Sequence, residues 1–123
     1  MVGADGSSDR RASSADLAAL PPELAKQSLS QGMIILPRDA ALQAIAQLTQ
    51  SGWRLENWEG WVKMRDGTRT KSISHSGSFA LARDPSRAAE SAKASIEKAH
   101  AFWARNPEFA GAELYFGLTF GAA

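Results

Sequence analysis

The sequence predicts an α+β fold of ferredoxin-like type, with element order β-α-β-β-α-β and a four-stranded antiparallel sheet that carries both helices on one face. Three features of the chain lead to this expectation. The last segment alternates strictly between apolar and polar residues, a long helical stripe of small apolar residues precedes it, and an Asp-Gly turn joins two strand-like segments before that. Together they indicate two split β-α-β units joined by a hairpin.

The length of 123 residues is enough for one domain, which is preceded by an N-terminal extension. Residues 1–14 are rich in Gly, Ser, Asp and Arg and have little to bury, which is typical of a disordered tail. Residues 15–31 contain spaced leucines interrupted by two prolines, and Pro22 at a first helical position predicts a short helical segment there. Residues 32–121 then form a single α+β domain, against which the amphipathic segment 15–31 is expected to lie.

The first strand and the first helix follow directly. An apolar run at residues 33–36 ends at Pro37, and its length and its proline stop favour a strand buried on both faces. Asp39 follows where the N-cap of a helix belongs. Apolar residues then recur at helical spacing up to Gly52, which is expected to end the helix in the common C-terminal manner.

A hairpin is predicted next. Residues 53–64 are rich in tryptophan and alternate between apolar and polar residues, as strands do. Asp66-Gly67 favours a type I′ turn, because that turn needs positive φ at its central residues. The returning strand is predicted over residues 68–82, where every even position from 68 to 78 is Ser or Thr.

The tryptophan-rich strand leaves two alternatives for its buried face. Strict alternation divides six large apolar residues between the two faces of the sheet. A β-bulge near Gly60 would instead collect four of them in one core and leave Trp58 and Trp61 together on the outer face. The bulge is preferred because it explains the glycine and gives one continuous core, and either alternative leaves at least one tryptophan off the main core. The six residues are Trp53, Leu55, Trp58, Trp61, Val62 and Met64.

The second helix and the last strand have the clearest patterns. Asp84-Pro85 supplies a cap and a first-turn proline, and Asn106-Pro107 ends the helix. The last strand is predicted over residues 112–120, with apolar side chains at even positions from 114. The predicted buried stripe of the helix has spacings of three and four residues and consists of Ala89, Ala92, Ile96, Ala99 and Trp103.

Composition and motifs argue against several functional classes. The net charge of +1 disfavours a dedicated binder of nucleic acid or of anionic membranes. The chain has no cysteine and only two histidines, which are 25 residues apart, so no metal site is expected. It also has no phosphate-binding glycine motif, no signal peptide and no apolar run long enough for a membrane helix. We therefore expect no cofactor, no membrane association and a cytoplasmic location.

The predicted functional surface is the sheet face opposite the helices, because a one-sided sheet must solvate or cover its second face. Four residues are assigned to it as candidate binding residues: Trp58, Trp61, His75 and Tyr115. Aromatic side chains there would supply contact area at low entropic cost. His75 would be the general base of an enzyme, but no carboxylate–histidine pair is fixed by spacing, so a protein without catalytic activity is the favoured expectation.

Three functions are compatible with this surface. The first is a non-enzymatic protein-binding or regulatory module that meets a protein partner or a second copy of itself through the tryptophan-rich hairpin and the open sheet face. The second is a cofactor-independent enzyme or ligand binder of the dimeric α+β-barrel type, which would take a small molecule. The third is an RNA-binding module, disfavoured by the near-neutral charge and by the absence of an RNP1 pattern.

Overall fold

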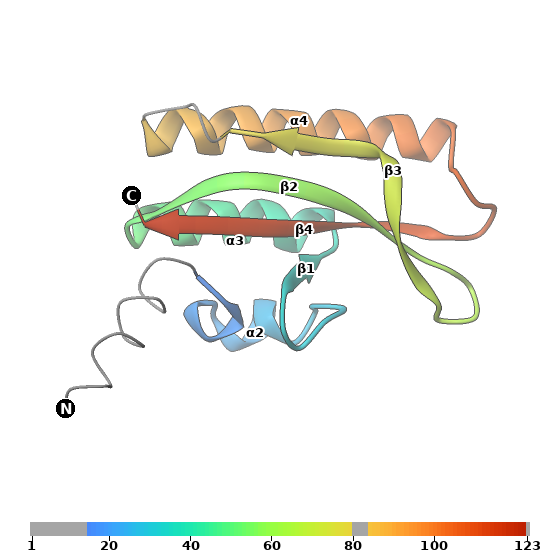
Figure 1. Ribbon diagram of the computed structural model, residues 1–123, viewed down its shortest axis with the longest axis horizontal. Helices are drawn as coiled ribbons and strands as arrows, with labels where there is room; N and C mark the ends of the chain where they lie inside the picture. Colours follow the sequence, from blue (N-terminus) through green and yellow to red (C-terminus); the bar gives the residue numbers. More distant parts are fainter. Residues whose placement is uncertain (1–14, 80–83, 123) are drawn as a thin grey trace.

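The computed structural model describes residues 15–79 and 84–122 (Figure 1). The predicted tail at residues 1–14 and the predicted strand end at 80–82 lie outside these residues. The elements are, in chain order, a 3₁₀ turn η1 (Leu17–Ala19), α2 (Pro22–Ala25), β1 (Ile34–Leu36), α3 (Arg38–Gln50), β2 (Trp53–Lys63), β3 (Arg69–Ser78), α4 (Pro85–Arg105) and β4 (Glu113–Ala122).

The sheet has the strand order β1-β4-β2-β3, and neighbouring strands are antiparallel. The α+β class and the antiparallel sheet are therefore confirmed. The ferredoxin-like topology is not matched, because that fold has its first and third strands at the centre of the sheet, whereas here β4 and β2 are central. Element order does not discriminate between the two arrangements, since each β-α-β unit skips one strand in both.

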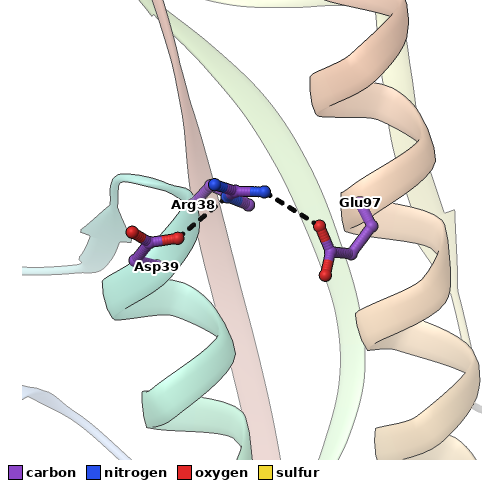
Figure 2. Close-up of polar contacts among 3 residues, drawn as sticks. All are labelled: Arg38, Asp39 and Glu97. Carbon is purple, nitrogen blue, oxygen red and sulfur yellow. Dashed lines mark hydrogen bonds and ion pairs between the residues drawn. The ribbon is translucent and has the colours of Figure 1, made fainter.

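Helices α3 and α4 pack beside each other on one face of the sheet (Figures 1 and 2). The main core lies between them and the sheet, and all five residues of the predicted α4 stripe are buried in it. The even-numbered apolar residues of β4 face the same core, as the alternation predicts. Asp84 caps α4 by accepting a hydrogen bond from the Ser86 N–H at 2.9 Å, also as predicted.

Two predicted local features are wrong. Helix α3 begins at Arg38 with Pro37 as its N-cap, so Asp39 is not the cap; it lies in the first turn, where a carboxylate suits the positive end of the helix dipole. The β2–β3 turn is not type I′, because Gly67 alone has positive φ, at 91°. The Met64 N–H instead donates to the Thr68 carbonyl at 2.7 Å, and the Met64 carbonyl accepts from the Gly67 N–H at 3.0 Å. These bonds close a three-residue loop with glycine in its left-handed position.

Residues 15–33 run along the β1 edge of the sheet. The Ile35 N–H donates to Ser28 Oγ at 3.1 Å, and the Ile35 carbonyl accepts from the Leu29 N–H at 2.9 Å. Leu20 and Leu24 of the same segment are buried in the main core. The amphipathic segment thus satisfies an otherwise unpaired strand edge and enlarges the core.

Candidate functional site

The buried face of β2 is decided by an irregularity that differs from both sequence alternatives. The register between β2 and β4 shifts between Leu55 and Asn57, and it continues without interruption through Gly60. This shift brings Leu55 onto the same face as Trp58 and Val62, all three of which are buried. The prediction that Trp58 lies outside the core is therefore wrong, and Trp61 is the tryptophan that the structure leaves off the core.

The bulge predicted near Gly60 exists in the pairing with β3, but the extra residues belong to β3. Glu59 pairs with Ser76 and Trp61 pairs with Lys71, so β3 gains three residues over its partner. Figure 1 shows the sharp bend in β3 that results. The extra length breaks the alternation of β3 and turns His75 toward the helices, which corrects its predicted place on the open face.

Gly60 makes room for this bend. A Cβ placed on Gly60 would lie 3.0 Å from the His75 Cβ and 3.1 Å from both the His75 carbonyl oxygen and the Ser72 Cβ. Because two different residues of β3 lie close to the position of the missing side chain, close approach, and not φ, favours glycine here.

On the open face the structure brings together the other two predicted residues, Trp61 and Tyr115, as directly paired neighbours. The Trp61 indole is half-buried and lies across Gly117, since a Cβ there would come within 2.8 Å of Nε1. The Lys71 ammonium lies 5.8 Å from the Trp61 ring centroid and pairs with Glu59 at 3.2 Å. Trp61 thus already has internal partners, and less of its ring is free for an external one.

Tyr115 offers a pH-dependent check of this arrangement. Burial raises the pKa of the Tyr115 phenol above its ordinary value of 10.0; nearby Glu113 adds to the rise and Arg69 opposes it. A raised pKa in the folded state means that the native protein holds the proton longer than the unfolded chain does, so stability is lost as pH rises past the unfolded value. We expect the free energy of unfolding, measured in urea, to fall more between about pH 9 and pH 11 in the wild type than in Tyr115→Phe. Parallel curves would contradict the burial of the phenol.

The remaining two predicted residues, Trp58 and His75, meet on the opposite side of the sheet in a cleft of about 410 Å³. This helix-side cleft lies between α4 and the part of the β2–β3 hairpin that contains Trp58 and His75. It is lined by Trp58, His75, Ser76, Ser95, Lys98, Ala99 and Phe102.

Trp58 forms the rigid base of the helix-side cleft. Its side chain is 1% exposed and meets the Phe116 ring edge-on, with centroids 5.3 Å apart. The indole N–H donates to Ser95 Oγ at 3.2 Å. Because this bond uses the Ser95 oxygen as an acceptor, the Ser95 O–H remains able to donate into the cleft.

His75 is held from two directions. Its ring lies edge-on to Phe102 and Trp103 of α4, with centroids 5.9 and 6.0 Å apart. The Glu108 carboxylate lies 4.0 Å from His75 Nε2 and accepts a hydrogen bond from Ser72 Oγ at 2.7 Å. The 4.0 Å separation exceeds a hydrogen bond, so Glu108 is a neighbour of the imidazole and not a hydrogen-bond partner.

Of the residues that α4 contributes to the cleft, the sequence analysis named only Ala99, as part of the core stripe. Ser95 lies four residues before Ala99 and Phe102 three residues after it, so both lie beside that stripe. The available signal was Phe102, a large aromatic next to the core stripe, which is 48% exposed in the structure. Its place in the structure is in the lining of the helix-side cleft.

The structure defines this chain as an α+β domain with one antiparallel sheet, and the comparisons with known proteins assign it to no family. The chain matches no family model, no curated protein sequence and no solved structure. Within residues 15–79 and 84–122, no three His, Asp or Glu side chains gather in a way that could hold a metal ion. None of the described helices is long and apolar enough to cross a bilayer.

Proposed function

We propose that this protein binds a small molecule with a flat apolar body in the helix-side cleft. The observation that carries the proposal is the cleft itself, which places His75 and the Ser95 hydroxyl beside apolar surfaces of Trp58, Ala99 and Phe102. Its volume of about 410 Å³ falls within the range of about 300–1,000 Å³ that is usual for small-molecule sites.

The chemistry of the cleft walls supports binding of such a molecule. Ligand sites combine mostly apolar walls with a few polar groups that fix orientation. Phe102 and Ala99 supply apolar surface on α4, and Trp58 is held in one orientation by Phe116 and Ser95. A preorganised wall of this kind lowers the entropic cost of binding.

Protein contact through the open sheet face is less well supported by the geometry. Trp61, the aromatic centre of that face, lies between Gly117 and Lys71. The Lys71 ammonium, which pairs with Glu59, already lies over this ring at 5.8 Å from its centroid. The helix-side cleft is open to a ligand without movement of an ion pair. The proposal concerns binding alone and includes no catalytic step.

The proposal is tested with a variant that fills the cleft. Ser95→Leu places a branched apolar side chain in the cleft and removes the acceptor of the Trp58 N–H, whereas Ala94→Leu adds the same side chain at the adjacent exposed position. A panel of small aromatic fragments is screened by saturation-transfer NMR. We expect fragments that bind the wild type and Ala94→Leu to bind Ser95→Leu about tenfold more weakly.

Two outcomes of the screen count against the proposal. One is that no fragment binds the wild type. The other is that the fragments bind Ser95→Leu as well as they bind Ala94→Leu, while circular dichroism shows both variants to be folded. The second outcome places binding elsewhere on the molecule.

A further inference from the structure

We infer that the helix-side cleft selects an anion, specifically a small aromatic carboxylate. This inference rests on the proposed binding function and adds the charge of the ligand. Among the described residues that line the cleft, Lys98 carries a full positive charge and none is acidic. The other polar groups, His75 and the hydroxyls of Ser76 and Ser95, can all donate hydrogen bonds.

Glu97, the acidic residue next to Lys98 on α4, points away from the cleft. Glu97 precedes Lys98 in the sequence, but adjacent helical residues do not face each other. Its Oε1 accepts a hydrogen bond from Arg38 Nη1 at 3.0 Å, which directs it toward α3, as Figure 2 shows. Within the described part of the chain, no carboxylate lies within ion-pair distance of the Lys98 ammonium.

The acidic group behind His75 does not reverse this charge. Glu108 does not line the cleft, and its Oε2 accepts from Ser72. The lining therefore presents the positive charge of Lys98 to a ligand, and no carboxylate belongs to that lining.

The position of Ser95 completes a site for a carboxylate. Ser95 and Lys98 are three residues apart on α4 and so lie on one side of the helix. The Trp58 N–H already occupies the Ser95 oxygen as an acceptor, which favours outward donation by the hydroxyl. A carboxylate can accept from the ammonium and the hydroxyl together while the aromatic body of the ligand lies against Phe102.

The test compares three probes of similar shape: 2-naphthoate, 2-naphthylmethanol and 2-naphthylmethylammonium. Dissociation constants come from titrations followed by ¹H–¹⁵N correlation spectra at low and high salt. We expect the wild type to bind the carboxylate about tenfold more tightly than the alcohol, and the ammonium compound most weakly. Added salt should reduce the preference for the carboxylate.

Lys98→Gln is expected to reduce this preference to about threefold or less, because only hydrogen bonds from Ser95 and His75 remain. Lys93→Gln removes the same charge from the same helix, outside the cleft, and should leave the preference unchanged. If all three probes bind equally, or if Lys98→Gln keeps the full preference, the inferred selectivity is wrong although binding in the cleft stands. If none of them binds while fragments of the panel still bind in the cleft, the inferred selectivity is wrong and the proposed function stands; the proposed function fails when no fragment of the panel binds either.

Discussion

Trp58→Ala is expected to lower the free energy of unfolding by about 3–5 kcal/mol, the usual range for removing a large aromatic side chain from a core. Trp58 is 1% exposed and is among the largest fully buried side chains of the described residues. Its loss would remove the edge contact with Phe116 and the hydrogen bond to Ser95. Urea unfolding followed by circular dichroism measures the change.

Trp61→Ala is the matched control for this prediction. The same side chain is removed three residues along the same strand, from a half-buried position outside the main core. We expect a loss of about 1 kcal/mol, because much of the ring area is not removed from water on folding. If Trp61→Ala costs as much as Trp58→Ala, the assignment of the two residues to opposite faces of β2 is incorrect.

Gly60→Ala is expected to destabilise the protein by about 1–3 kcal/mol, as overpacking of a close contact does. The added methyl group would meet the His75 Cβ at 3.0 Å and the His75 carbonyl oxygen at 3.1 Å. Relief requires movement of the β3 backbone, since the contacts include a carbonyl. The same movement would displace His75 from the helix-side cleft and weaken ligand binding there.

The sign of the Gly60 effect makes the test sharp. Glycine inside a strand normally weakens it, so alanine at an unconstrained position would leave stability unchanged or raise it. Gly32→Ala serves as the control, because a Cβ at Gly32 meets nothing within 4 Å. Its free energy of unfolding should stay within about 0.5 kcal/mol of the wild type. A neutral or stabilising Gly60→Ala would show that β3 does not fold over Gly60.

Patterns that depend on one element were predictable from the sequence. The α4 stripe and the β4 alternation are each set by a single period, and the structure buries both as expected. Strand order was not predictable, because it depends on which strands pair after the helices have crossed the sheet. The two arrangements of a β-α-β-β-α-β chain bury similar faces, so apolar periodicity is the same in both.

The four candidate residues lie on two different faces of the sheet because Trp58 and His75, which were misplaced, belong to the irregular strands β2 and β3. Glu56 and Asn57 are consecutive polar residues between Leu55 and Trp58, a break in alternation that marks the position of the shift. Placing the parity change there, and not at Gly60, would have predicted Trp58 in the core. The three extra residues of β3 left no comparable signal, because Ser and Thr at alternate positions fit either face of a sheet. The position of His75 therefore could not be read from the sequence.

The claim that ligand binding occurs in the helix-side cleft, and not on the open sheet face, is tested most directly by the indole N–H signals of the four tryptophans in a ¹H–¹⁵N spectrum. The Trp58 N–H donates to Ser95 inside the cleft, and the Trp61 N–H lies against Gly117 on the opposite face. During a titration with 2-naphthoate we expect the Trp58 signal to move with ligand concentration while the Trp61 signal stays in place. Movement of the Trp61 signal with a stationary Trp58 signal would contradict the assignment of the site.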